Sequence, residues 1–557
     1  MKPLEWTVGL TDEQQYAVMM QGPRQLVVAS AGSGKTATLV ARAIHAVRSG
    51  RLQARQVLVL AFNRAAAHEL DARLQARLRE TGKRDGPPIR ASTLHAFALS
   101  FVQRAHGTRY RVVDDILPLA LQQLPEHCAV FSDYWLFFRV FDGMEIRHPD
   151  DFPSWRAWRR FVGEQAACLD GQRGFLTLRH ELVDTHFEQA VANWLYLHDV
   201  DYCYAWHGRW PAGLAAVFPG CGRPLSGSRV FILKGCGRHL VCLDRTRQST
   251  GRPSRAGRQD IVVTLDDFRS GRLFRVLRQR LRSGRQPIPS GRLAGLMDRA
   301  GLGLNGRILS SLQRSVALAR LNRLDDAQLQ RRLPAGSGTL QTRYAIPLLM
   351  RLTEWCRQFG LEQGVIDHHG MLEQAVIAMQ AGKARHGYGL ILVDEFQDTS
   401  RLGVALLQAM LGQDPSCQLF AVGDDWQSIY RFAGAQSDVL QQFGTLFGSV
   451  QLAYLTRTFR FDQYLADVAG KFIRKNPAQW VKTVRAHRPG SPDTIQLCSY
   501  TSADHMQRQC EQILQALATH KDRPASVLIL GRYRHLVPAG LPRWRQSFPL
   551  LHIVYQT

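Results

Sequence analysis

A glycine-rich loop near the N-terminus constrains the fold of this chain more than any other stretch. Its residues are Ala29, Ser30, Ala31, Gly32, Ser33, Gly34, Lys35 and Thr36. It follows the apolar run 26–28 and precedes a helix-forming segment, and this order is typical of a phosphate-binding loop. The backbone N–H groups of such a loop, together with the N-terminus of the helix, face an anion. We therefore expect Lys35 to contact the β- and γ-phosphates of ATP and Thr36 to hold Mg²⁺, although Ala29 replaces the first glycine of the general pattern.

An acidic pair far downstream supplies the partner that such a loop requires. Asp394 and Glu395 directly follow the apolar run 389–393, which predicts a strand, and α/β sheets place ligand groups at the carboxyl ends of strands. Asp394 is positioned to bind Mg²⁺ with Thr36, and Glu395 to polarise water for attack on the γ-phosphate. Two acids after a strand more often cap a helix, but their combination with the phosphate loop favours a functional role.

A further strand end combines a glutamine with aromatic residues. The apolar run 418–422 is followed by Gly423 and by a segment that contains Gln427, Tyr430 and Phe432. Gln427 is a candidate sensor of the γ-phosphate or of the attacking water. The aromatic side chains suit stacking on unpaired bases, with packing into a core as the alternative.

The charge of the chain points to a polyanionic partner. The 557 residues include 71 Lys and Arg against 46 Asp and Glu, which gives a formal net charge of +25 at pH 7. Such an excess attracts nucleic acid, whereas the alternative is an arginine-rich composition with solvated side chains. The sequence contains no apolar run long enough for a membrane span and no apolar signal-peptide core at its start, so we predict a cytoplasmic protein without a membrane partner.

Short apolar runs alternate with helical patterns at both ends of the candidate motor region. This alternation predicts an α/β fold with a doubly wound parallel sheet. The pattern stops for about 270 residues and resumes near residue 389, which predicts a large insertion with helices and a small mixed sheet. Three strands are expected inside the insertion, within residues 201–204, 229–233 and 260–265.

The ordered motifs resemble those of the superfamily 1 helicases of the UvrD/Rep type, and most closely the helicase IV branch of that family. The resemblance covers residues 8–103 and 385–465, with weaker similarity toward the end of the chain. The matching segments are residues 10–14, 29–36, 61–70, 93–97, 394–398, 422–436 and 455–461.

The resemblance implies a role for each matching residue. Gln14 would read the adenine edge and Phe459 would stack on the adenine. Gln427 would couple the γ-phosphate to the DNA site, and Arg460 would stabilise the charge of the transition state. By the same matching, the residues on the single-stranded DNA path are Phe62, His95, Tyr430 and Phe432.

The family also implies a domain layout and an activity. A RecA-like, P-loop motor domain would comprise residues 1–103 and 385–447, an enlarged accessory insertion residues 104–384, and an incomplete second RecA-like domain residues 448–557. The implied activity is ATP-dependent translocation on single-stranded DNA, with 3′-to-5′ polarity and duplex unwinding, in replication, repair or recombination. The implied partners are single-stranded DNA, junctions of single- and double-stranded DNA, and DNA-repair or transcription proteins, with the protein itself a monomer.

Two departures from the family pattern open an alternative. Ala37 and Ala433 stand where relatives often carry arginine, and Thr557 falls where the fifth helicase motif is expected. We therefore expect a helicase truncated before motifs V and VI, with impaired hydrolysis. The alternative is an ATP-hydrolysis-deficient protein that binds nucleic acid or a polymerase.

Overall fold

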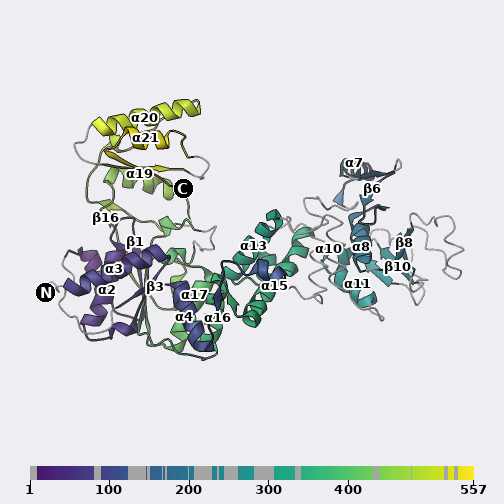
Figure 1. The fold of residues 1–557 in the computed structure, drawn as a ribbon, viewed down its shortest axis with the longest axis horizontal. Helices are drawn as coiled ribbons and strands as arrows, with labels where there is room; N and C mark the ends of the chain where they lie inside the picture. Colours follow the sequence, from purple (N-terminus) through teal and green to yellow (C-terminus); the bar gives the residue numbers. More distant parts are fainter. Residues whose placement is uncertain are drawn as a thin grey trace. The chain divides into compact units, whose positions relative to one another are not determined.

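The computed structural model describes most of the chain as two compact units, residues 1–455 and 456–557. The described residues are 9–80, 89–122, 146, 151–165, 167–169, 172–198, 200–205, 229–234, 238–243, 261–281, 306–332, 340–430, 438–477, 479–519, 525–531 and 537–556. Figure 1 labels their helices and strands.

The first unit is built on a parallel sheet of six strands. Their spatial order is β15 (Gln451–Leu455), β1 (Arg24–Ala29), β14 (Gln418–Gly423), β13 (Leu390–Val393), β2 (Val57–Ala61) and β3 (Ala91–Thr93). This arrangement confirms the predicted α/β fold with a parallel sheet. The sequence division placed residues 448–557 in a second domain, whereas β15 pairs with β1 inside the first unit.

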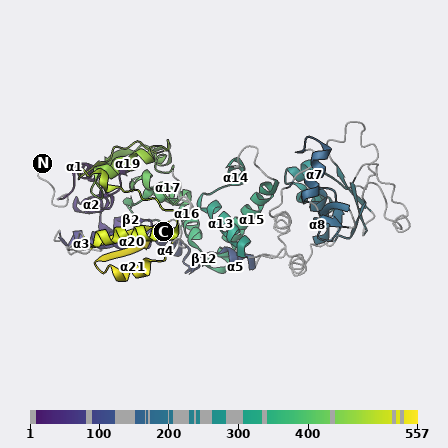
Figure 2. The ribbon, with the colours of Figure 1, turned by 90° about the horizontal axis from the view of Figure 1, so that it is seen from above.

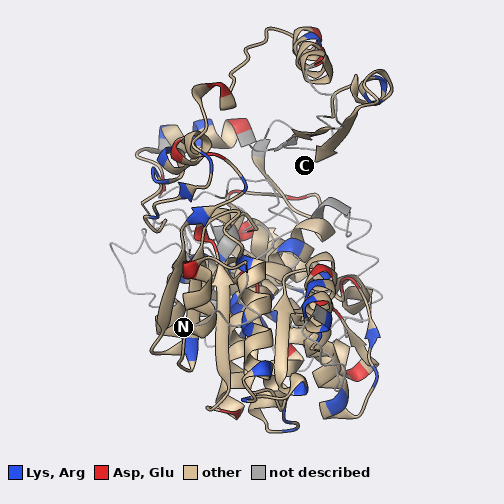
Figure 3. Ribbon diagram, turned by 90° about the vertical axis from the view of Figure 1, so that its left-hand side faces the viewer, with Lys and Arg blue, Asp and Glu red and all other residues tan. Residues whose placement is uncertain are grey.

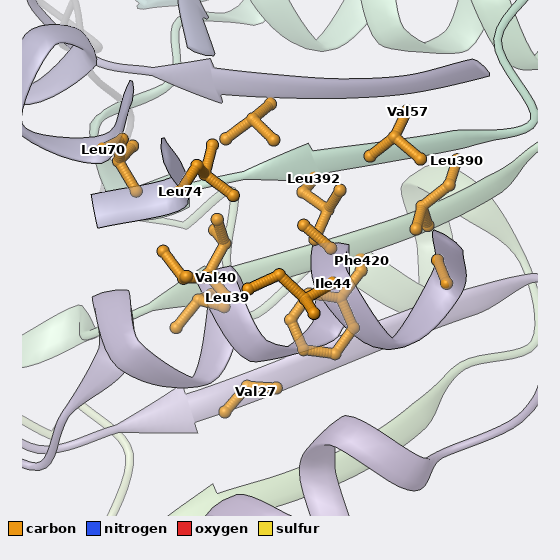
Figure 4. Packing of buried hydrophobic residues seen from close by; sticks show 14 of the residues in the cluster. Val27, Leu39, Val40, Ile44, Val57, Leu70, Leu74, Leu390, Leu392 and Phe420 are labelled. Carbon is orange, nitrogen blue, oxygen red and sulfur yellow. The ribbon is translucent and has the colours of Figure 1, made fainter. Parts of the chain in front are cut away.

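Helices bury the sheet on both faces, which explains why its strands are almost continuously apolar. The helices α2 (Lys35–Arg48) and α3 (Arg64–Glu80) lie on one side, and α4 (Leu94–His106), α16 (His368–Gln380) and α17 (Arg401–Gln413) lie on the other (Figure 1). Figure 4 shows Leu39 and Ile44 of α2 directed at Val27, Leu392 and Phe420 of three strands. This contact fixes the phosphate loop, because α2 begins where the loop ends.

Side-chain caps fix where the helices near the sheet edge begin. Thr11 precedes α1 (Asp12–Met19) and accepts the backbone N–H of Gln14 at 3.3 Å, while the Gln14 side chain accepts the N–H of Thr11 at 2.9 Å. This reciprocal pair is a capping box. Thr93 caps α4 by accepting the N–H of Ala96 at 3.1 Å.

The insertion contains a mixed four-stranded sheet, as predicted. Its spatial order is β11 (Ile261–Thr264), β10 (Arg238–Leu243), β9 (Arg229–Leu233) and β8 (Tyr202–Ala205). Helices α8 (His186–Leu197), α10 (Leu265–Arg269) and α11 (Leu273–Leu281) pack their apolar side chains on it. The sequence analysis predicted three of these strands and missed β10.

A second cluster of the insertion consists of helices, among them α13 (Gly306–Leu321), α14 (Asp326–Arg332) and α15 (Leu340–Gln363). These three lie together in both views of the ribbon (Figures 1 and 2). Leu312 and Val316 of α13 pack with Leu348 and Leu352 of α15, and with the short helix α5 (Leu117–Gln122). Among the described helices, none is both long and apolar enough to cross a bilayer.

The second unit carries its own small apolar core. Its strands β18 (Ala525–Leu530) and β19 (Leu551–Gln556) pair in parallel, and helices α20 (Ala503–Thr519) and α21 (Leu541–Ser547) pack against them. Trp544 is 1% exposed at the centre of this core. Its indole N–H donates to Glu511 Oε1 at 2.9 Å.

A buried arginine joins the insertion to a helix that packs against the motor sheet. Arg320 at the end of α13 donates to both carboxylate oxygens of Asp367 at 2.7 and 3.1 Å, and to Glu373 of α16 at 2.8 and 3.0 Å. Asp367 also caps α16 by accepting the N–H of Gly370 at 2.7 Å. One guanidinium therefore compensates two carboxylates that are largely removed from water.

Replacing Arg320 by alanine should lower the free energy of unfolding by about 3–5 kcal/mol, because it leaves two carboxylates without their cation. Urea unfolding measures this loss. Arg314→Ala is the matched control, since Arg314 on the same helix is exposed and donates to the carbonyl of Ser310 at 3.2 Å. We expect the control to change stability by no more than about 0.5 kcal/mol. Equal effects of the two substitutions would contradict a bridging role for Arg320.

Candidate functional site

The phosphate loop connects β1 to α2 with two glycines in the left-handed conformation. Gly32 has a φ of 74° and Gly34 a φ of 83°. A Cβ atom at Gly34 would lie 2.3 Å from the Gln14 Nε2 atom, so both backbone strain and lack of space require glycine there. The loop also joins the edge strand, because Ser30 N donates to the carbonyl of Leu455 at 3.0 Å.

Helix α1 holds Gln14 against the loop. The Gln14 amide donates to the carbonyl of Ser33 at 2.8 Å, and its oxygen serves the capping box. Arg42 on α2 supports this placement by donating to the carbonyl of Val18 in α1 at 2.8 Å. The predicted adenine-reading glutamine therefore lies beside the phosphate loop, with its amide committed to the loop backbone.

The residues around the loop fit a bound phosphate chain. The buried Ser33 hydroxyl oxygen has no hydrogen-bond partner among the described residues, and the helix N-terminus begins at Lys35. Such a loop presents N–H donors and a cation to an anion. The side chains of Thr36 and Asp394 supply the oxygen ligands that Mg²⁺ prefers.

The acidic pair after β13 meets the loop, although the two segments are far apart in the sequence. Lys35 Nζ lies 2.7 Å from Glu395 Oε2, and the Thr36 hydroxyl hydrogen-bonds to Asp394. Asp394 is 7% exposed. Burial and the neighbouring Glu395 charge raise the pKa of Asp394 to about 6, while Lys35 and Thr36 act in the opposite direction.

The acidic motif also contains backbone strain and a second perturbed carboxyl. Glu395 has a φ of 49°, in the left-handed region that non-glycine residues seldom adopt. Burial and the charge of Glu395 raise the pKa of Asp398 to about 7. The strain and the two raised pKa values are typical of functional sites.

Gln427 reaches the same region from the end of β14. Its amide donates to the Asp424 carboxylate, which also accepts the N–H of Trp426 at 3.1 Å. The N–H of Asp424 donates to Gln397 Oε1 at 2.9 Å, and Gln397 Nε2 donates to Glu395 Oε2 at 2.8 Å. The predicted γ-phosphate sensor is thus linked to the predicted general base through side chains.

Two of the predicted DNA-contacting aromatics lie together. The rings of Phe62 and Tyr430 are 4.9 Å apart between centroids, although one residue follows β2 and the other β14. Phe62 is 37% exposed, which leaves part of its ring available for stacking. Phe432 lies outside the described residues.

His95, the remaining residue predicted on the DNA path, packs against a second histidine. Its ring meets that of His368 at 5.4 Å in an edge-to-face arrangement. Burial and the neighbouring His368 and His369 lower the pKa of His95 to about 4. The imidazole of His95 is therefore neutral at pH 7 and offers hydrogen bonds and a ring face instead of a charge.

Phe459 and Arg460 belong to the second unit, where they follow the short strand β16 (Arg457–Thr458). Phe459 is 47% exposed, and its ring lies 5.5 Å from that of His487. Arg460 N donates to the Thr458 hydroxyl at 3.3 Å. Their predicted roles toward adenine and the transition state stay predictions.

Sequence reasoning missed two residues that the fold brings to the site. Gln397 was passed over because it lies inside the acidic motif between two more conspicuous carboxylates. His368 carries no local signal at all, since it lies 273 positions from His95 in the chain. Within the described ranges, no group of three or more His, Cys, Asp or Glu residues forms a candidate metal cluster.

Basic side chains are distributed widely over the protein. Lys and Arg lie on helices of both units (Figure 3). They account for the formal charge of +25.

The parallel sheet, the loop between β1 and α2 and the acids after β13 define a RecA-like P-loop motor domain. The model of the UvrD/REP helicase N-terminal domain family matches residues 10–132 and 309–448. The protein belongs to the UvrD-like helicase family.

Several curated proteins are similar to this chain. DNA helicase IV of Escherichia coli strain K12 is 25% identical over 548 residues, which are 98% of this chain and 58% of that protein. A protein of Geobacillus kaustophilus that belongs to an ATP-dependent helicase/nuclease is 26% identical over 76% of this chain and 36% of its own length. A probable DNA helicase II homolog of Mycoplasma capricolum is 27% identical over 30% of this chain and 22% of its own length. The chain thus spans little more than half of E. coli helicase IV and smaller shares of the other two.

The raised pKa of Asp398 predicts a pH-dependent effect of Asp398→Asn on stability. The folded state binds this proton more tightly than the unfolded state, where the pKa is near 3.8. The wild-type carboxyl therefore lowers stability progressively as the pH rises from about 4 to about 7. Asp398→Asn should stabilise the protein by about 2–4 kcal/mol more at pH 8 than at pH 4, as measured by urea unfolding in EDTA.

The exposed Asp414 provides a control of opposite sign. The Ser416 hydroxyl holds the pKa of Asp414 below its usual range, so this carboxylate contributes stability above its unfolded pKa and loses it as the pH falls. Asp414→Asn should therefore destabilise the protein slightly at pH 8 and not at pH 3. A pH-independent effect of Asp398→Asn would show that its carboxyl is not held protonated by the fold.

Proposed function

We propose that this chain provides the ATP-binding motor of a DNA helicase or translocase, which moves along single-stranded DNA with 3′-to-5′ polarity. One observation carries the proposal. Lys35 Nζ lies 2.7 Å from Glu395 Oε2 and Thr36 bonds to Asp394, so two motifs 360 residues apart form one site. Relatives with the names of DNA helicases support the assignment to DNA.

The residues divide the work of hydrolysis among them. Lys35 exchanges its contact with Glu395 for the β- and γ-phosphates when ATP enters, which frees the carboxylate. Glu395 then accepts the proton of a water whose oxygen attacks the γ-phosphorus. Thr36 and Asp394 would hold a magnesium ion, and this ion supplies charge neutralisation for the phosphates.

The second part of the proposal concerns single-stranded DNA. The Phe62 and Tyr430 rings meet at the carboxyl edge of the sheet, where β2 and β14 end, and present aromatic surface for stacking on bases. Stacking of this kind tolerates any base sequence. The excess of Lys and Arg favours the phosphate backbone.

The family resemblance supports the remaining assignments. Phe459 of the second unit would stack on adenine, and Arg460 would stabilise the transition state as an arginine finger. The proposed substrates include junctions of single- and double-stranded DNA. A monomer acting in the cytoplasm, with DNA-repair or transcription proteins as partners, completes the proposal.

Lys35→Ala should weaken binding of a fluorescent ATP analogue by about 10- to 100-fold, because a charge-assisted contact of about 1.5–3 kcal/mol is lost. It should also abolish ATP hydrolysis stimulated by single-stranded DNA. Fluorescence titration and a phosphate-release assay with oligo(dT) measure the two effects.

The exposed Lys383 provides the matched control, and Lys383→Ala should leave both quantities within about twofold. Nucleotide binding that is equal in Lys35→Ala and the wild type would reject the ATP site. Affinity for oligo(dT) that nucleotide does not change would favour the alternative of a nucleic-acid-binding protein without a motor function.

Tyr430→Ala and Phe62→Ala should each weaken binding of oligo(dT) by about 5- to 150-fold, since stacking contributes about 1–3 kcal/mol per base. Fluorescence anisotropy at a fixed salt concentration measures the dissociation constants. Tyr454→Ala is the control, because Tyr454 is an aromatic residue that is 50% exposed on the edge strand β15. The stacking assignment fails if all three variants bind like the wild type.

A further inference from the structure

Gln397 joins the ends of two central strands through both ends of its side chain. It lies in the short 3₁₀ turn η5 (Phe396–Asp398) after β13 and is 1% exposed. Its amide nitrogen donates to Glu395 Oε2 at 2.8 Å. Its amide oxygen accepts the N–H of Asp424, after β14, at 2.9 Å. The side chain thus bridges the acidic motif and the segment that carries Gln427.

The contacts of these neighbours extend the bridge in both directions. Glu395 Oε2 also accepts from Lys35 Nζ at 2.7 Å, which continues the path to the phosphate loop. The Asp424 carboxylate accepts from the amide of Gln427. Tyr430 lies three residues beyond Gln427, and its ring contacts Phe62. One hydrogen-bonded path therefore runs from Lys35 to Gln427, just before the proposed DNA-stacking pair.

The surroundings fix the orientation of the Gln397 amide. Its nitrogen faces the carboxylates of Glu395 and Asp398, at 2.8 and 3.4 Å, and a flipped amide would place its oxygen against these acceptors. The backbone of Gly423 lies directly alongside. A Cβ atom there would come within 2.9 Å of Gln397 Oε1, so the glycine provides the space that the bridge needs.

We propose that Gln397 is a positioning residue that couples DNA binding to ATP hydrolysis, and this inference rests on the proposed function. When Lys35 turns to the phosphates, Gln397 is the remaining side-chain donor to Glu395 Oε2 among the contacts of the described residues. It keeps that oxygen engaged, so the other oxygen of Glu395 faces the water. A shift of the segment from Asp424 to Tyr430 moves the acceptor end of the bridge and thereby moves the carboxylate.

The bridge predicts a specific kinetic effect of Gln397→Met, which keeps the length of the side chain and removes both hydrogen bonds. The rate of hydrolysis with saturating oligo(dT) should fall about 10- to 100-fold, as is typical for residues that orient a reacting group. The KM for ATP and the affinity for oligo(dT) should stay within about threefold. The ratio of DNA-stimulated to unstimulated rates should fall toward one, which a merely structural role would not produce.

Two further variants keep the test decisive. Gln397→Glu retains the acceptor for Asp424 N and loses only the donor to Glu395, so it should show the same loss even if Gln397→Met does not fold. Gln413→Met is the matched control, because the Gln413 amide donates to the carbonyls of Met379 and Ala384 away from the site. The control should keep the wild-type stimulation ratio.

The outcomes separate this inference from the proposed function. A wild-type protein without DNA-stimulated hydrolysis would overturn the proposed function and the coupling role together. A stimulated wild type with an unchanged stimulation ratio in Gln397→Met and Gln397→Glu would overturn the coupling role alone. A reduced ratio in both variants, with the control unchanged, supports it.

Discussion

The parallel pairing of β1, β14 and β13 is the constraint on which the rest of the site depends. Because these strands are adjacent and run in the same direction, their carboxyl ends deliver the phosphate loop, the Asp424 segment and the acidic pair to one edge. Burial between helices on both faces holds the register, and α2 takes part in that burial through Leu39 and Ile44. The same helix begins at Lys35, so the packing that stabilises the sheet also aims the lysine at Glu395.

The electrostatics of this edge are organised for a ligand that brings negative charge and its counter-ion. Asp394 and Asp398 have raised pKa values because they are buried beside Glu395, and Lys35 compensates only part of that charge. The left-handed backbone at Glu395 adds strain in the same turn. Such features cost stability and persist where function selects them. A cation bound at Thr36 and Asp394 would relieve the repulsion, whereas a phosphate chain would draw Lys35 away from Glu395.

The hydrogen bonds of Gln397 and Arg320 show how distant parts of the first unit are connected. Gln397 links two strand ends inside the motor sheet, through an amide that has both polar atoms engaged. Arg320 links a helix of the insertion to α16, through a guanidinium shared by two acids. Both are buried polar links, and such links are costly to leave incomplete. The inserted segment is therefore tied to the motor by charge as well as by chain connectivity.

The sequence by itself determined the parallel α/β fold, the phosphate loop and the candidate acids Asp394 and Glu395. These features depend on local order along the chain: an apolar strand followed by glycines, or by acids, at a fixed offset. Only the tertiary structure decided that β15 joins the first sheet, that Gln397 bridges two motifs, and that His368 packs on His95. The strand β10 was missed because its pattern of burial appears only once its neighbours in the small sheet are in place. Contacts between residues hundreds of positions apart leave no local periodicity, because they arise from the way strands and helices pack.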